Sequence, residues 1–139
     1  MQSIFANELY GIEHDADRQL VIIRRSAMAR SSANWDLVLA ALDVLRPLRG
    51  QRLLIDVRRA PGNNDPTLEQ SIHKFRRQLS ELFPITASLA ATAVGRLQLV
   101  RMSRERSESG SRVFLDESEA IAYLMAQPVG AAASRPRSD

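Results

Sequence analysis

Hydrophobic residues along this chain follow two patterns: short runs rich in β-branched residues, and longer stretches with an apolar residue every three or four positions. The first pattern is typical of strands and the second of helices. Leu9–Glu13 and Leu20–Ile23 lie on either side of a polar turn sequence and predict a β-hairpin. The continuous apolar run within Arg52–Val57 predicts a central strand covered on both faces. Ala87–Val94 and Val113–Leu115 predict two more, so we expect about five strands.

Helical spacing predicts two helices, one before and one after the central strand. One begins after Ser31–Asn34, a segment rich in N-cap residues, has Trp35 in its first turn, and ends before the next proline. The other begins at Asp65, because aspartate is a favourable N-cap and Pro66 a favourable first helical residue, and it ends before Pro84. Each helix carries one apolar stripe, so each is expected to pack one side against the sheet.

Two further helices are predicted in the second half of the chain. Gly95–Arg106 combines a weak apolar stripe with several arginines and predicts a basic third helix. Asp116 followed by Glu119 resembles a capping box, which predicts the start of a fourth helix that continues to about Met125. Beyond Pro128 no apolar stripe continues.

The resulting order is strand, strand, helix, followed by three strand–helix pairs. Strands joined by crossover helices pair in parallel, whereas the hairpin pairs antiparallel, so the prediction is a mixed sheet with four helices. We expect a single α/β domain over residues 9–126. A short N-terminal segment, 1–8, precedes it, and a disordered C-terminal tail, 127–139, follows it.

Composition narrows the chemistry that this domain can perform. A length of 139 residues is that of one domain. The chain has no cysteine, which excludes disulfides, thiolate metal sites and cysteine nucleophiles. The net charge of +3 invites a nucleic-acid interpretation. Arginine and alanine are both abundant, however, as a GC-rich coding sequence would make them, so a solvated basic surface explains the charge more simply.

The chain also lacks the features of membrane and exported proteins. No apolar stretch reaches the roughly 20 residues that a membrane helix needs. The N-terminal sequence has neither the basic start nor the apolar core of a signal peptide. We therefore expect a cytoplasmic protein without a membrane span.

Two segments suggest a family. The central strand Leu54-Ile55-Asp56-Val57 and the closing segment Val113–Leu124, in which a short strand with Phe leads through an acidic turn into Glu-Ala-Ile, resemble the SpoIIAA-like, STAS-related proteins of bacteria. The similarity covers roughly residues 8–126. It implies a SpoIIAA-like α/β fold without enzymatic activity, which binds a regulatory protein partner or a small, lipophilic ligand. The sequence also leaves a homodimer open.

In the regulatory branch of that family, a phosphorylatable Ser or Thr follows the central strand. The usual Asp-x-Ser arrangement is missing here, because Arg58 stands two residues after Asp56. Thr67 is the nearby hydroxyl and hence the candidate phosphosite, although a threonine at a helix start is common for capping reasons alone.

The loop from Asp56 to Thr67 is the predicted contact surface, because ligands of open α/β sheets bind beyond the carboxyl ends of the strands. Its arginines and the start of the next helix could hold an anion. The simpler interpretation is a capped turn, in which Asp56 and the asparagines bond to local backbone groups. Trp35, behind a candidate flap at 28–35, could line a pocket. The candidate binding residues are Asp56, Arg58, Arg59, Asn63, Asn64, Asp65, Thr67 and Trp35.

Two other functions remain as alternatives. A small hydrolase or transferase would use Asp56 with the loop arginines, but the sequence has no Gly-x-Ser-x-Gly elbow and predicts His73 on the polar side of a helix. A weak nucleic-acid binder would use the arginine-rich surface. His14 and His73 are not in a metal-ligand spacing, and no glycine-rich phosphate loop follows a strand, so neither a metal nor a cofactor is expected.

Overall fold

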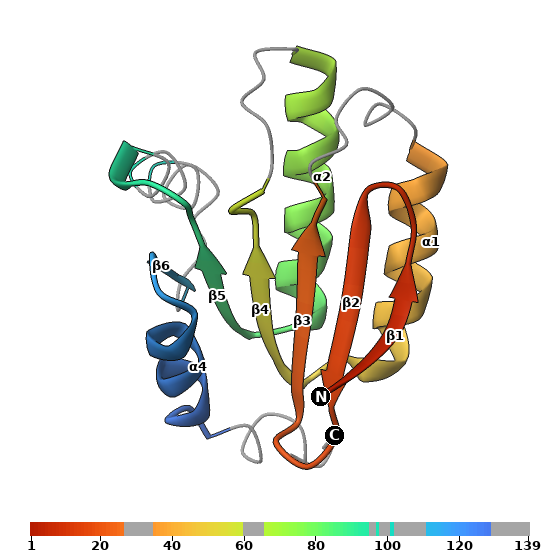
Figure 1. Cartoon of the computed structure of the whole chain (residues 1–139). Helices are drawn as coiled ribbons and strands as arrows, with labels where there is room; N and C mark the ends of the chain where they lie inside the picture. Colours follow the sequence, from red (N-terminus) through yellow and green to blue (C-terminus); the bar gives the residue numbers. More distant parts are fainter. Residues whose placement is uncertain (27–34, 60–65, 95–96, 98–100, 102–110, 129–139) are drawn as a thin grey trace.

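Six strands form one mixed sheet in the order β1-β2-β3-β4-β5-β6 in the computed structural model, which describes residues 1–26, 35–59, 66–94, 97, 101 and 111–128 (Figure 1). The first three strands pair antiparallel, and β3 to β6 pair in parallel. The strands are β1 (Gln2–Ala6), β2 (Tyr10–Asp15), β3 (Leu20–Arg25), β4 (Arg52–Asp56), β5 (Ile85–Leu89) and β6 (Ser111–Phe114).

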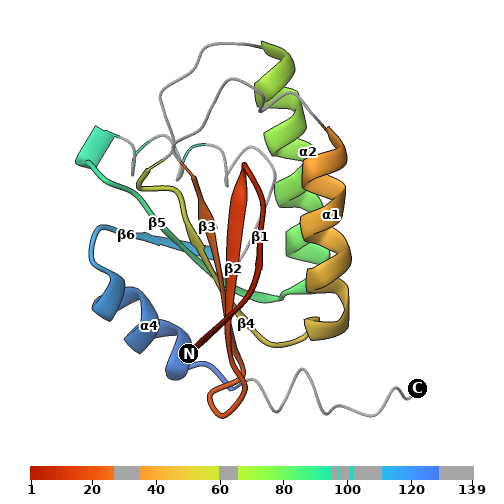
Figure 2. The same ribbon diagram turned by 45° about the vertical axis from the view of Figure 1, so that its right-hand side comes forward.

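Helices cover both faces of this sheet. Figure 2 shows α1 (Trp35–Leu45) and α2 (Pro66–Leu82) on one face and α4 (Glu117–Met125) on the other. A short 3-10 helix, η2 (Arg46–Leu48), follows α1 directly. None of the helices that the structure describes is both long and apolar enough to cross a membrane.

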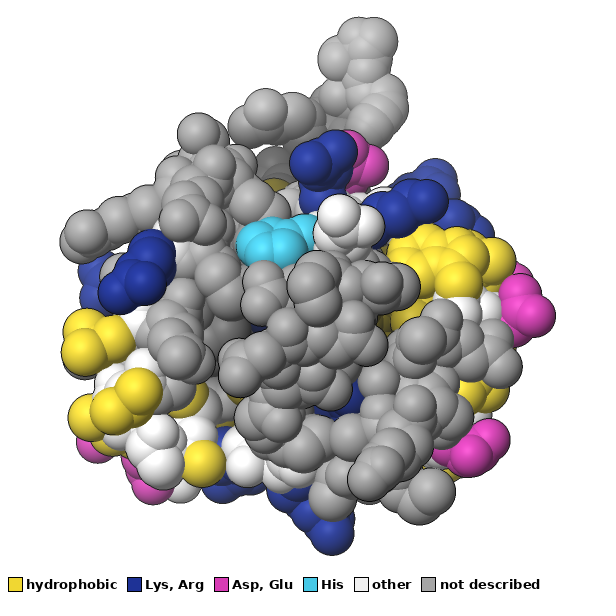
Figure 3. All heavy atoms as spheres, turned by 90° about the horizontal axis from the view of Figure 1, so that it is seen from above, with side chains coloured by type: hydrophobic (Ala, Val, Ile, Leu, Met, Phe, Trp, Pro, Cys, Tyr) yellow, Lys and Arg dark blue, Asp and Glu magenta, His cyan; other side chains and the backbone are white. Residues whose placement is uncertain are grey.

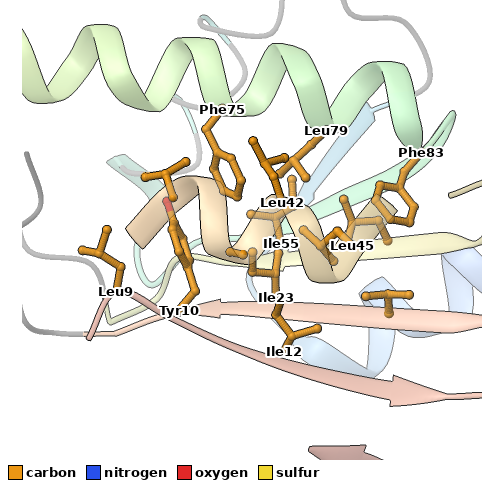
Figure 4. Packing of buried hydrophobic residues seen from close by; sticks show 14 residues of the cluster. Leu9, Tyr10, Ile12, Ile23, Leu42, Leu45, Ile55, Phe75, Leu79 and Phe83 are labelled. Atoms are coloured by element: carbon orange, nitrogen blue, oxygen red, sulfur yellow. The ribbon is translucent and has the colours of Figure 1, made fainter. Parts of the chain in front are cut away.

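Side chains alternate in direction along the central strands, so each face of the sheet has its own hydrophobic core. In β3, Val21 and Ile23 join the cluster under α1 and α2, whereas Leu20 and Ile22 join the cluster under α4. The continuous apolar runs of β3 and β4 therefore reflect strands buried on both sides, as predicted for β4. Figure 4 shows the larger cluster, in which side chains of α1 and α2 meet those of the sheet.

The hairpin, the central strand and the mixed α/β class are confirmed, but the strand count was wrong. Residues 2–6 form β1 instead of a separate N-terminal segment, and β1 pairs with β2 to make a sixth strand. Its side chains are exposed or half-buried, so the sequence carries no buried stripe there. The strand predicted at Ala87–Val94 also lies two residues earlier, at Ile85–Leu89, and Val94 is exposed.

The helix count also differs from the prediction. The described part of the chain contains three α-helices rather than four, and most of the helix predicted over Gly95–Arg106 falls outside the described residues. The fourth predicted helix is confirmed as α4, with Asp116 at its N-cap. The predicted tail lies outside the described residues from position 129 onward. In its first, described residue, the carbonyl of Gln127 accepts a hydrogen bond from Arg52 Nη2 at 3.0 Å.

Candidate functional site

Asp56, the residue on which the sequence analysis centred, is the last residue of β4 and is 4% exposed. Because side chains alternate along a strand, Asp56 lies on the same face as Leu54, which packs under α4. Its register partner on β3 is Arg24. The end of the central strand therefore carries a buried acid beside an arginine on the α4 face.

Arg24 connects Asp56 to two further carboxylates. Its Nη1 donates to Asp56 Oδ2 at 2.7 Å and to Glu117 Oε1, at the start of α4, at 2.9 Å. Its Nε donates to Glu13 Oε2 of β2 at 2.8 Å. One guanidinium thus ties together β2, β3, β4 and α4.

Arg58 holds Asp56 from the other side. Its backbone N–H and its Nε both donate to Asp56 Oδ1 at 3.0 Å. Its Nη2 donates to Asp56 Oδ2 at 3.0 Å and to Glu117 Oε1 at 2.8 Å. We call Glu13, Arg24, Asp56, Arg58 and Glu117 the charged cluster.

The charged cluster has a buried centre and a half-exposed rim. The side chain of Asp56 is 6% exposed, whereas those of the other four members are 29–36% exposed. With three carboxylates and two guanidinium groups, its formal charge is 2 − 3 = −1. The cluster therefore presents fixed charges of both signs, with a small negative excess.

Mutual hydrogen bonding favours the ionised forms of Asp56, Arg58 and Glu117. Burial opposes ionisation of Asp56, but the hydrogen bonds from Arg58 and Arg24 outweigh it and hold the pKa of Asp56 below its ordinary value. Hydrogen bonds from Arg24 likewise lower the pKa of Glu117. The pKa of Arg58 is raised by its hydrogen bonds to Asp56. At neutral pH the carboxylates of Asp56 and Glu117 are therefore poor proton acceptors.

The structure brings only part of the predicted site together. Asp56 and Arg58 meet in the charged cluster, and Arg59 is exposed in the turn that follows. The interpretation of Asp56 as a group that bonds to the local backbone is confirmed by its contact with the Arg58 N–H. Outside the described residues lie Asn63, Asn64, Asp65 and the side chain of Thr67.

Trp35 lies apart from these residues. It is half-buried at the start of α1 and packs against the core on the opposite face of the sheet from Asp56. The ammonium of Lys74 lies 4.8 Å from the centroid of its ring. Most of the flap predicted before Trp35 falls outside the described residues.

Sequence reasoning missed three members of the charged cluster: Glu13, Arg24 and Glu117. One signal for Arg24 was available in the sequence. Arg24 directly follows the apolar run of β3, and Asp56 directly follows that of β4. Parallel pairing of the two runs therefore places Arg24 beside Asp56. Glu117 could not be found this way, since its approach depends on how α4 folds back onto the sheet.

Neither histidine belongs to the charged cluster. His14 Nε2 lies 3.0 Å from Gln51 Oε1, and His73 is half-buried on α2. Within the described ranges, no group of three His, Cys, Asp or Glu residues could hold a metal ion.

Comparison with known proteins adds no relative to this description. No protein-family model matches the chain, and no curated protein or solved structure shows significant similarity to it.

Proposed function

We propose that this chain is a binding domain without catalytic activity, of the SpoIIAA-like, STAS-related type, and that its charged cluster contacts a protein partner in the cytoplasm. The observation that carries the proposal is the rim of the cluster. Glu13, Arg58 and Glu117 reach the surface while their charged ends are held by hydrogen bonds to neighbours. A surface whose side chains are already ordered loses little conformational entropy when a partner binds.

The net negative charge of the charged cluster favours a partner with basic side chains. Its excess of one negative charge favours a partner that brings a lysine or arginine side chain to the exposed side of Glu13 or Glu117, whose other side is bound by Arg24. Such complementary charges contribute mainly to specificity and to the rate of association.

The alternatives are less well supported. A hydrolase or transferase would need Asp56 as a proton acceptor or nucleophile, yet two arginines hold its oxygens and lower its pKa. A nucleic-acid binder would need arginines directed at phosphates, yet Arg18, Arg24 and Arg46 form ion pairs with the protein's own carboxylates.

The proposal is tested by affinity capture from a lysate of the source organism with the immobilised protein and two variants. Glu117→Gln removes one negative charge from the rim, and Arg49→Gln changes an exposed arginine after η2. We expect a captured protein that the wild type and Arg49→Gln retain and that Glu117→Gln loses by about tenfold. Circular dichroism checks that each variant is folded. Capture of nothing, or equal capture by all three proteins, contradicts the proposal.

A further inference from the structure

Strand β1 is an edge strand that contains no charged residue. It pairs with β2 on one side, and among the described residues no strand pairs with its other side. An unpaired edge presents backbone N–H and C=O groups to which another strand can add, and proteins commonly protect such edges with charged residues or proline. β1 contains neither, and Ile4 in its middle is 38% exposed. The edge of β1 is therefore open to strand addition.

A β-bulge limits the length of regular pairing along this edge. The register of β1 against β2 shifts between Ser3 and Phe5, so Ile4 is the extra residue of the bulge. Bulges bend a strand and interrupt its pairing. A bent edge of five residues forms few hydrogen bonds with another strand, so a stable contact there needs further surface.

Helix α1 lies at the same edge of the molecule and supplies that surface. Figure 1 shows α1 beside β1, and Asn7, directly after β1, donates from Nδ2 to the carbonyl of Leu37 at 3.0 Å. Phe5 of β1 packs against the core cluster to which α1 also contributes. The strand edge and the helix thus form one continuous side of the molecule.

Apolar side chains extend around α1 beyond the stripe that faces the sheet. Apart from Asp36 and Asp43, every residue of α1 is apolar. A helix that packs on one sheet needs one apolar stripe, and its remaining positions are typically polar. The buried stripe of α1 consists of Val38, Ala41, Leu42 and Leu45. Figure 3 shows hydrophobic side chains at the surface on the side of the molecule where α1 lies.

The apolar residues outside the buried stripe lie on the two flanks of α1. Trp35 is on the flank toward α2, because the ammonium of Lys74 on α2 lies 4.8 Å from the centroid of its ring. Leu37, Ala40 and Val44 follow one another at spacings of three and four, so they lie together on the other flank, and all three are half-buried. This second flank faces the β1 side of the molecule. We call β1 together with these three residues the edge surface.

We infer that the edge surface joins two copies of this chain into a dimer. About a twofold axis, β1 pairs antiparallel with β1 of the second copy, so that the two six-stranded sheets become one. The flanks of the two α1 helices pack against each other beside the paired strands. Strand pairing supplies hydrogen bonds, and the helix contact supplies apolar area toward the roughly 1,200–2,000 Å² that a stable interface buries.

The absence of charge favours a second copy as the occupant. In a twofold contact, residues near the axis face their own equivalents, so charged residues at those positions would repel one another. Neither β1 nor the flank of Leu37, Ala40 and Val44 contains a charged residue. The edge surface is therefore compatible with itself, whereas the charged cluster favours a partner of different composition.

The opposite edge of the sheet is less suited to pairing. β6 has four residues, and its Arg112 is exposed. Pairing of β1 with β6 of another copy would also be a head-to-tail contact, which repeats into an open chain of molecules. Pairing of β1 with itself closes after two copies.

This inference goes beyond the proposed function and does not depend on it. The edge surface and the charged cluster share no residue. Failure of partner capture therefore leaves the dimer standing, and a monomeric protein leaves the partner contact standing.

The test is sedimentation velocity of the 139-residue chain over concentrations from about 1 to 300 μM. We expect the mass to rise from that of one chain to that of two, with a Kd of about 10 μM or tighter. NMR spectra over the same dilution series locate the contact. The backbone amide signals of β1 and of Leu37, Ala40 and Val44 should change with concentration, and those of β6 should not.

Two pairs of matched variants assign the interface. Ile4→Lys places a positive charge on the strand edge of both copies, and it should weaken the dimer by about tenfold or more. Leu115→Lys makes the same change at another exposed apolar residue, just beyond β6, and should leave the Kd within about twofold.

The second pair changes alanine to glutamate on two helices. Ala40→Glu brings like charges together on the flank of α1 and should also weaken the dimer by about tenfold or more. Ala122→Glu makes the same change at an exposed position of α4 and should leave the Kd within about twofold. Circular dichroism checks that each variant is folded, and if one variant of the edge surface does not fold, the other variant and the NMR dilution series decide.

Three results would overturn the inference. The first is a mass of one chain at every concentration. The second is a dimer that Leu115→Lys or Ala122→Glu weakens as much as the variants of the edge surface do, because that result places the contact elsewhere. The third is a dimer that Ala40→Glu weakens and folded Ile4→Lys does not, because β1 then takes no part in the contact.

Discussion

At the scale of single residues, Asp56 has the position of a candidate reactive carboxylate, but its role in the structure is to hold two arginine side chains in place. Its two oxygens accept hydrogen bonds from the backbone and side chain of Arg58 and from the side chain of Arg24. Each of these donors is positively charged or belongs to a charged residue. A carboxylate bound in this way orders its neighbours and has little tendency to take up a proton.

Replacing Asp56 should therefore reduce stability. Asp56→Asn leaves Arg24 and Arg58 without their shared buried acceptor, and we expect the free energy of unfolding to fall by about 2–3 kcal/mol. The loss stays at the low end for a broken buried pair because both arginines keep some contact with water. Urea denaturation measures the change.

The matched control is Asp43→Asn, because Asp43 pairs with Arg46 on the surface. Exposed pairs contribute little, so the control should change the free energy of unfolding by less than about 1 kcal/mol. If the two substitutions have the same effect, Asp56 is not the anchor of the charged cluster.

At the scale of elements, the sequence predicted those parts of the fold that local chemistry determines. The hairpin, the buried run of β4, the Pro66 start of α2 and the capped start of α4 are all found at or near the predicted residues. β1 was missed because its side chains are largely exposed, and its place depends on pairing with β2. Pairing of this kind leaves no local pattern.

The start of α4 provides a test at this scale. The side chain of Asp116 accepts a hydrogen bond from the backbone N–H of Glu119 at 2.9 Å. Asp116→Ala removes this cap and should lower the free energy of unfolding by about 1 kcal/mol. Ser118→Ala, at an exposed position in the first helical turn, should change it by less than about 0.5 kcal/mol. Urea denaturation of both variants measures these changes in the free energy of unfolding. Equal changes would show that the Asp116 cap contributes nothing.

At the scale of the whole molecule, the candidate site was only half predictable. Asp56 and Arg58 are close in sequence, so their contact follows from a tight turn after β4. Glu13 and Glu117 reach Arg24 from sequence positions 11 and 93 residues away. Those contacts depend on the register of the β2–β3 hairpin and on the return of α4 to the sheet, which no local pattern specifies.

These long-range contacts should make the stability of the whole fold depend on pH. The pKa values of Asp56 and Glu117 are lowered in the folded state from ordinary values of 3.8 and 4.5. A lowered folded-state pKa stabilises the protein above the ordinary pKa, and this stabilisation is lost as the pH falls. The free energy of unfolding should therefore decline as the pH decreases below about 4.5.

Urea denaturation at a series of pH values between neutrality and pH 3 measures this decline. Glu117→Gln has no group at this position that takes up a proton as the pH falls, so its stability should fall less steeply over the same range. The same slope in the variant and the wild type would mean that Glu117 contributes no pH-dependent stabilisation.

Arg24 and Arg25 are adjacent in β3, yet the side chain of Arg24 belongs to the charged cluster, whereas that of Arg25 lies on the opposite face of the sheet, with its Cζ 6.0 Å from the centroid of the Tyr10 ring. Because side chains alternate, inserting or deleting one residue early in β3 would turn each arginine to the other face. Leu20–Ile23 would still present apolar side chains to both sides, so the hydrophobic core would tolerate such a shift better than the charged cluster would. We therefore expect the spacing between the β2–β3 turn and this arginine pair to be constrained more strongly by the contacts of the two arginines than by the hydrophobic core.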